Sequence, residues 1–121
     1  MSWQFNGTQA VFLQIADKLR RDIVNGVYPP GTQIPTVRHL AFEASVNPNT
    51  MQRALSLLED EGLLVSRGTV GRYVTSEVAL IDTARKQICF ATVERFCRET
   101  KALGISRCEL MDYIKEVGIY E

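Results

Sequence analysis

The sequence predicts a mainly α-helical protein with one small β-hairpin, arranged as an N-terminal domain of about residues 1–76 and a C-terminal helical tail of residues 77–121. Three observations predict this organisation. Two short helical patterns lie in the first part, separated by only a few residues. Two β-prone runs on either side of a glycine-rich tip follow them directly. A long helical pattern and a last, separately capped helix make up the tail.

The first predicted helix runs from about residue 10 to residue 25. Its apolar side chains recur at helical spacing, and charged side chains take much of the other face. Gly26 stands where a glycine often ends a helix. The stretch Tyr28-Pro29-Pro30-Gly31 predicts a turn, because each proline restricts φ and lacks a backbone donor.

Two helix starts then follow in close succession. Thr36 is a suitable N-cap for a helix to about Glu43, because its hydroxyl can accept a hydrogen bond from a free backbone N–H. Asn47 suits the next N-cap, with Pro48 at the first helical position, where a missing N–H costs nothing. Gly62 is placed to end this second helix. The stretch therefore predicts a helix, a tight turn and another helix.

A β-hairpin is predicted directly after these helices, over about residues 63–75. Leu63-Leu64-Val65 and Arg72-Tyr73-Val74-Thr75 are β-prone, and Gly68-Thr69-Val70-Gly71 forms the tip between them. A hairpin in this place is called a wing. The first 76 residues are therefore predicted to form a winged helix-turn-helix domain.

The tail begins with a helical pattern from about residue 77 to residue 103, equivalent to about 40 Å of helix. Gly104 ends it, and Ser106 with Glu109 matches a capping box for a last helix to about Val117. Two joined helices with this much apolar surface usually require a partner, which predicts a dimerisation tail. The apolar positions expected at the dimer interface are Leu80, Ile81, Ala84, Ile88, Ala91, Phe96, Leu110 and Ile114.

Composition limits the possible functions. The 121 residues are 45% hydrophobic, so a core is expected, and no apolar run reaches the roughly 20 residues of a membrane span. We therefore expect a cytoplasmic protein without membrane contact. One histidine and three cysteines without CxxC spacing argue against a metal site and a disulfide framework. Because paired carboxylates in an apolar setting and a phosphate-binding loop are both missing, we expect neither an enzyme nor a cofactor.

The helix-turn-helix has the geometry of a DNA reader. A major groove about 12 Å wide admits one helix, held by a second helix across the backbone. The inserted recognition helix would be residues 48–61, with the wing on the adjacent groove or backbone. Asparagine and glutamine can pair with adenine, arginine can pair with guanine, and a helix start suits a phosphate. The candidates for DNA contact on the helices are Arg38, Asn47, Asn49, Thr50, Gln52 and Arg53.

The charge pattern is consistent with this interpretation without requiring it. The formal net charge is zero, which counts mildly against nucleic-acid binding. Between Gly62 and Ser76, however, the chain carries Arg67 and Arg72 and no acidic residue. Both arginines are expected to lie along the DNA backbone or to enter the minor groove.

From Ile15 to Thr75 the sequence resembles the DNA-binding domain of GntR-family bacterial transcription regulators. The resemblance rests on Gly-x-Tyr-Pro-Pro-Gly, Pro-Thr-x-Arg-x-Leu-Ala and Val-Asn-Pro-Asn-Thr-x-x-Arg-Ala-Leu. The short tail is similar to that of the YtrA-type branch, whose members lack the large effector domain of their relatives. The positions that the resemblance implies at the DNA are Arg38, Asn49, Thr50, Gln52 and the wing tip around Gly71; Thr69 in the same tip is a further candidate for DNA contact.

The same resemblance implies a homodimer, joined through the tail helices, that binds a double-stranded DNA operator with two-fold symmetry. Repression of neighbouring genes is the usual outcome in the family, and in this branch these are often ABC transporter genes. Three positions depart from the family pattern: His39 replaces a frequent glutamate, Ser45 a glycine and Thr69 a wing glycine. Ser45 would occupy a left-handed turn that favours glycine. The shifted wing leaves open which of its residues reaches the groove.

Two alternatives remain open. Winged helices also bind partner proteins, and a zero net charge suits that function. A small-molecule effector could instead bind between the tail helices and the winged domain, with Trp3, Phe5, Phe90 and Phe96 as walls. Packing within the fold or in a dimer explains these aromatic residues more simply, so no effector is indicated.

Overall fold

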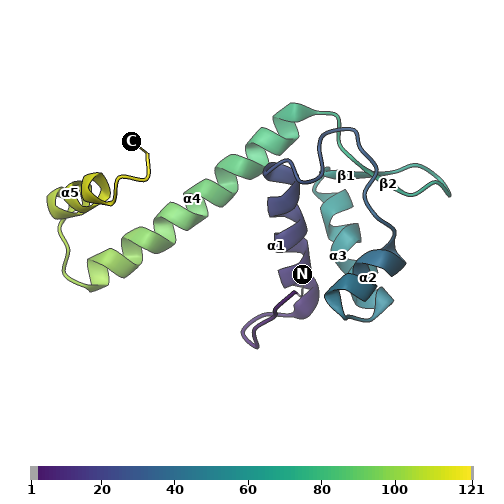
Figure 1. The fold of residues 1–121 in the computed structure, drawn as a ribbon, viewed down its shortest axis with the longest axis horizontal. Helices are drawn as coiled ribbons and strands as arrows, with labels where there is room; N and C mark the ends of the chain where they lie inside the picture. Colours follow the sequence, from purple (N-terminus) through teal and green to yellow (C-terminus); the bar gives the residue numbers. More distant parts are fainter. Residues whose placement is uncertain (1–2, 121) are drawn as a thin grey trace. The chain divides into compact units, whose positions relative to one another are not determined.

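In the computed structural model, which describes residues 3–120, the chain forms two compact units, Met1–Arg85 and Lys86–Glu121. The first unit contains, in chain order, α1 (Val11–Val24), α2 (Val37–Ala44), α3 (Pro48–Asp60), β1 (Leu64–Ser66) and β2 (Arg72–Val74) (Figure 1). The next helix, α4 (Val78–Ala102), begins in the first unit and continues in the second, where α5 (Arg107–Val117) follows it. The predicted order of elements is confirmed, and their ends differ from the prediction by one residue at most.

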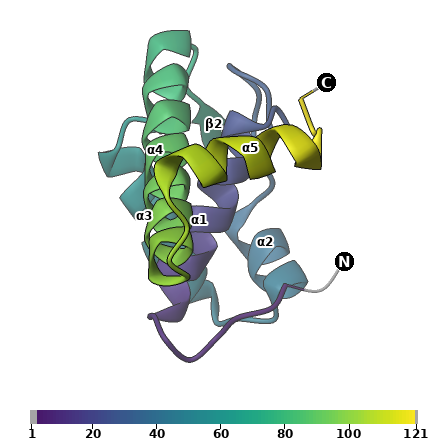
Figure 2. The same ribbon diagram turned by 90° about the vertical axis from the view of Figure 1, so that its left-hand side faces the viewer.

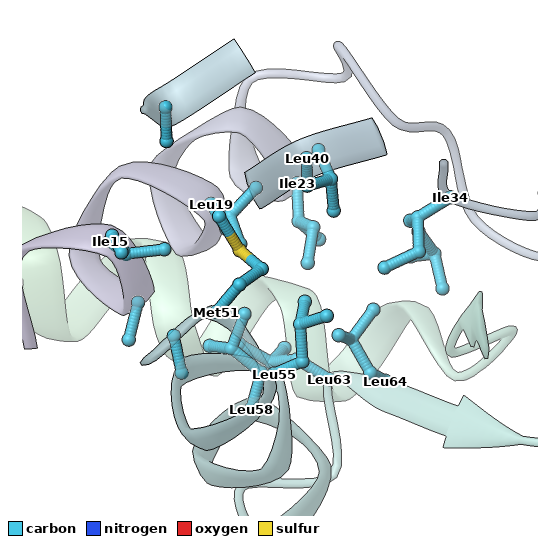
Figure 3. Packing of buried hydrophobic residues seen from close by; sticks show 14 of the residues in the cluster. Ile15, Leu19, Ile23, Ile34, Leu40, Met51, Leu55, Leu58, Leu63 and Leu64 are labelled. Atoms are coloured by element: carbon cyan, nitrogen blue, oxygen red, sulfur yellow. The ribbon is translucent and has the colours of Figure 1, made fainter. Parts of the chain in front are cut away.

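The core of the first unit is built around α3, which packs against α1, α2 and β1. Both views show the three helices grouped together (Figures 1 and 2), and Figure 3 shows their apolar side chains directed toward one another. Burying one large apolar side chain contributes about 1.5–3 kcal/mol, so this cluster is the main source of stability. The largest fully buried side chains are Ile15, Leu19, Leu40, Met51, Leu55, Leu58 and Val74.

Both caps of the helix-turn-helix are confirmed. The Thr36 hydroxyl accepts a hydrogen bond from the His39 backbone N–H at 3.1 Å, and the Asn47 side-chain oxygen accepts one from Asn49 at 2.8 Å. Pro48 occupies the first turn of α3. Each contact satisfies a backbone donor that the start of a helix leaves free. The start of α3 is therefore fixed by its own sequence, and with it the direction in which its first side chains point.

The turn between α2 and α3 requires one left-handed residue, Ser45, with φ 55° and ψ 45°. This is the strain expected from the sequence, and among the described residues Ser45 is the only non-glycine residue with positive φ. Its backbone N–H bonds to Phe42, and the Val46 N–H bonds to Ala41. The turn is therefore closed by backbone hydrogen bonds despite the unfavourable residue.

The wing is an antiparallel hairpin that is anchored on both sides. β1 and β2 pair in the register Leu64 with Val74 and Ser66 with Arg72. On its other edge β2 exchanges backbone hydrogen bonds with residues 31–34, so the hairpin is held by the segment before α2 as well. Gly71, at φ 128°, lies so close to this segment that a Cβ would stand 2.9 Å from the Gln33 side-chain nitrogen. The Gln33 side chain can move aside, so the positive φ is the main reason why glycine is favoured at this point of the wing.

The second unit is a pair of helices with little internal packing. Ser106 and Glu109 form the predicted capping box at the start of α5, and Gly104 turns the chain with φ 78°. None of residues 86–120 is buried. Within the described residues, no helix combines the length and apolar character needed to cross a membrane.

Replacing Ser45 with glycine is expected to stabilise the first unit by about 0.5–1 kcal/mol, because glycine adopts the left-handed conformation without steric cost while making the unfolded chain more flexible. Urea denaturation followed by circular dichroism measures the change. Ser56, inside α3, provides the matched control. Ser56→Gly should destabilise the protein, and equal effects from both variants would contradict the role given to the turn.

Candidate nucleic-acid interface

The exposed face of α3 carries the polar residues that the sequence singled out. Asn49, Gln52 and Arg53 are exposed, and Thr50 is half-buried. They lie opposite the buried stripe of the helix, which consists of Met51, Ala54, Leu55 and Leu58. The side chain of Asn47 is exposed, but its oxygen is occupied by the cap to Asn49. The first two turns of α3 therefore offer donors and acceptors at the surface without competing with the core.

A groove of about 330 Å³ separates the start of α2 from the wing. Arg38 contributes to one wall, and Thr69, Val70 and Gly71 of the wing tip contribute to the other. Arg38 is exposed. The structure therefore brings together two groups of predicted residues that lie about thirty positions apart in the sequence.

The wing tip is held in place by contacts that the sequence did not predict. The Gln33 side chain donates a hydrogen bond to the Val70 carbonyl at 2.7 Å. The Arg67 guanidinium lies 4.4 Å from the centroid of the Tyr73 ring and remains exposed. A cation held against an aromatic face keeps its charge while losing some freedom of movement. Arg67 is thus a positioned positive charge on the edge of the wing.

Arg72 differs from Arg67, the other arginine of the wing, because its side chain is only 14% exposed and points toward α3. Its Nε donates a hydrogen bond to Glu59, which also accepts from the Ser66 hydroxyl at 2.8 Å. Its Nη1 donates to the Gln52 side-chain oxygen at 3.3 Å. The expectation that Arg72 lies along the DNA does not match this arrangement, in which the guanidinium joins β2 to α3.

Two acidic residues at the C-terminal end of α3, Glu59 and Glu61, are paired with arginines within the fold. Partial burial raises the pKa of Glu59, but the hydrogen bonds from Arg72 and Ser66 and the charge of Arg72 outweigh it, so this pKa lies below its usual value. The Glu61 carboxylate receives two hydrogen bonds from Arg20 of α1, at 2.8 and 2.7 Å. Their hydrogen bonding raises the pKa of Arg20, although burial opposes it. These pairs compensate acidic charge that would otherwise repel a phosphate backbone.

Arg53 faces α1 as well as solvent. Its guanidinium carbon lies 3.9 Å from the centroid of the Phe12 ring. This aromatic partner, 41 positions earlier in the chain, was not predicted from the sequence. A planar guanidinium stacked on a ring retains free donors at its edge. Phe12, at the start of α1, therefore positions Arg53.

The predicted dimerisation residues divide between the two units. Ile81 and Ala84 are buried in the core of the first unit, so their side chains have no surface to offer a second copy, and they are removed from the predicted interface. From the helical pattern alone, these two residues could not be distinguished from the exposed apolar positions further along α4. Leu80 is exposed at the edge of the first unit, Ile88 is half-buried and Ala91 is exposed.

The remaining three predicted positions lie together. Phe96, Leu110 and Ile114 line an almost wholly apolar groove of about 510 Å³ within the second unit, between α4, α5 and the end of the chain. The sequence did not single out Leu103, Ile119 and Tyr120, which line the same groove and are strongly exposed. The second unit therefore presents a continuous apolar surface.

The aromatic residues considered as walls of an effector site are divided between the two units. Trp3 and Phe5 pack edge to face, with ring centroids 6.4 Å apart, against the core of the first unit. Lys18 covers the Trp3 ring at 4.6 Å. Phe96 belongs to the groove of the second unit, and Phe90 is exposed. Among the described residues, no group of three or more histidine, cysteine, aspartate or glutamate side chains is arranged to hold a metal ion.

Comparison with known proteins agrees with this geometry. Residues 12–74 match the family model described as bacterial regulatory proteins, gntR family. The chain is 31% identical over 115 residues to the uncharacterized HTH-type transcriptional regulator YhcF of Bacillus subtilis, covering 95% of both chains. It is 25% identical over 110 residues to the HTH-type transcriptional repressor YtrA of the same organism, covering 89% of this chain and 84% of YtrA.

Solved structures show the same fold. A GntR family transcriptional regulator from Listeria monocytogenes superimposes with a TM-score of 0.86 at 29% identity, over 93% of this chain and 98% of that one. The DNA-binding domain of AraR in complex with its operator ORX1 matches 62% of this chain and 95% of its own length, with a TM-score of 0.55 and 25% identity. The family match covers the helix-turn-helix and the wing together. The chain is therefore a member of the gntR family of bacterial regulatory proteins, with a winged helix-turn-helix transcriptional-regulator domain in its first unit.

Proposed function

We propose that this chain is a homodimeric transcription repressor that binds a DNA operator with two-fold symmetry. It acts in the cytoplasm, where the bacterial chromosome lies. In this proposal α3 enters the major groove, and the wing lies on the adjacent groove or backbone. By the resemblance to the YtrA-type branch, the regulated genes are neighbours of its own gene and include ABC transporter genes.

The observation that carries DNA binding is the shared exposed face of α3, Arg38 and the wing. Asn49 and Gln52 can bond base edges, while Arg38 on α2 and Arg67 on the wing supply exposed positive charge. Glu59 is paired with Arg72, and Glu61 is paired with Arg20. Because these carboxylates are neutralised, a chain of zero net charge can present this face to phosphates. The AraR domain, a structural relative, is bound to an operator.

The apolar surface of the second unit supports dimerisation. Exposed apolar surface of this kind is unfavourable in water and is normally covered by a partner. A second copy is the partner that a two-fold symmetric operator requires, because two identical domains then read two related half-sites. The interface proposed here uses Phe96, Leu103, Leu110 and Ile114, and it leaves out Ile81 and Ala84.

Salt dependence separates DNA binding from the alternative of a protein-interaction module. A dimer that contacts about six phosphates should lose roughly 10³-fold in operator affinity between 50 and 200 mM salt, because counterions are released from the DNA. The operator is first obtained by selecting bound sequences from a pool of random duplexes. Fluorescence anisotropy on the selected duplex then measures the slope. A nearly flat profile would support protein binding in place of DNA binding.

Two substitutions should separate base reading from backbone contact. Gln52→Ala is expected to relax the preference at one base pair of each half-site, at a cost of about 1–3 kcal/mol for the preferred sequence. Arg67→Ala should weaken all sequences nearly equally and lower the salt slope by about one. Binding to the operator and to single-base variants of it measures both effects. A uniform loss with Gln52→Ala would show that this residue does not read a base.

A charge in the apolar groove should break the dimer. Ile114→Glu is expected to give a monomer whose operator affinity falls by about 10²- to 10⁴-fold, because the two half-sites are no longer bound by one linked molecule. Cys108→Glu, at an exposed position of the same helix that does not line the groove, is the control. Sedimentation equilibrium measures the mass. A dimeric Ile114→Glu variant would place the interface elsewhere.

A further inference from the structure

The contact between Arg72 and Gln52 bears on which base the protein selects. Gln52 lies on the exposed face of α3, with Asn49 and Arg53, that is proposed to contact the bases (the reading face). Its side-chain amide has one accepting oxygen and one donating nitrogen. The oxygen lies 3.3 Å from Arg72 Nη1. A guanidinium has donors only, so the Gln52 amide is held in one orientation, with its oxygen toward Arg72 and its NH₂ group away from it.

Arg72 is itself held firmly enough to impose this orientation. Its side chain is mostly buried, and its Nε is bound by the carboxylate of Glu59, which the Ser66 hydroxyl also contacts. Ser66 and Arg72 are partners in the register of the wing, and Glu59 lies two turns after Gln52 on α3. These hydrogen bonds join the hairpin to α3, and one of them reaches the Gln52 side-chain oxygen.

We propose that Arg72 is a positioning residue that makes Gln52 read DNA as a hydrogen-bond donor, and that the base it selects is guanine. This inference rests on the proposed function. Guanine presents two acceptors, N7 and O6, side by side in the major groove, while adenine presents an acceptor beside a donor. A free glutamine favours adenine, because it can accept and donate at once. A glutamine whose oxygen is turned toward Arg72 presents its NH₂ group on the other side, and the two N–H donors match the two acceptors of the guanine edge.

The inference predicts a change in the preferred base that a general loss of affinity cannot imitate. In Arg72→Ala the Gln52 amide is released, so the preference at its base pair should shift from guanine toward adenine. In Gln52→Glu one carboxylate oxygen stays on Arg72 and the other becomes an acceptor, so the preference should move to cytosine, whose N4 donates. Each shift should amount to roughly 5- to 150-fold in relative affinity, the range of one good base contact.

The test is selection from random duplexes at fixed salt, performed on the full chain and on the variants Gln52→Ala, Gln52→Glu, Arg72→Ala and the double variant Gln52→Ala/Arg72→Ala. If Arg72 acts through Gln52, the double variant should have the same base preferences as Gln52→Ala alone. Gln52→Glu is nearly isosteric and exposed, so it keeps the test valid even if loss of Arg72 loosens the wing. Circular dichroism confirms that each variant is folded.

The outcomes are separable. Guanine at the position affected by Gln52 substitutions, with the two shifts above, would support the inference. Adenine at that position in the unmodified protein would overturn it, because the Gln52 oxygen would then be reading the base. A uniform loss with Arg72→Ala and a salt slope reduced by about one would also overturn it and make Arg72 a phosphate ligand. Failure of the unmodified protein to enrich any sequence would instead overturn the proposed function, and this inference with it.

Discussion

The arrangement of the first unit depends on one constraint, the burial of a single stripe of α3. Met51, Ala54, Leu55 and Leu58 are fully buried, and α1, α2 and β1 pack around them. Because side chains recur every 3.6 residues, burial of this stripe leaves Asn49, Gln52 and Arg53 no orientation except outward. The stability of the domain and the composition of its reading face are therefore set by the same helix. A change in the core would rotate or displace the surface side chains along with it.

Much of this was accessible from the sequence, because it depends on local chemistry. Thr36 and Asn47 cap helices through contacts two or three residues away, and Pro48 and Gly62 act on the backbone at their own positions. Left-handed Ser45 was expected for the same reason. Each of these features needs only a few neighbouring residues for its explanation, and the order of helices and strands follows from them.

The features that escaped prediction depend on partners far away in the chain. Nothing near Arg72 indicates that it meets Glu59 and Gln52, which lie 13 and 20 residues earlier. Arg53 finds its ring on α1, and Gln33 reaches across 37 positions to the wing tip. Likewise, helical periodicity places Ile81 on an apolar face of α4, but it does not show whether the winged domain or a second copy covers that face. Only the tertiary structure separates these cases.

No side chain of residues 86–120 is buried, and this has a consequence for how the protein responds to its own concentration. An isolated helix as short as α5 is only marginally stable in water, and within the unit none of its side chains is buried. Under the proposed assembly, ordering of this helix and association of two chains stabilise each other. The concentration of dimer then rises with the square of the monomer concentration when monomer predominates. Occupancy of an operator would follow expression of the gene more steeply than in proportion, giving a threshold without any bound effector.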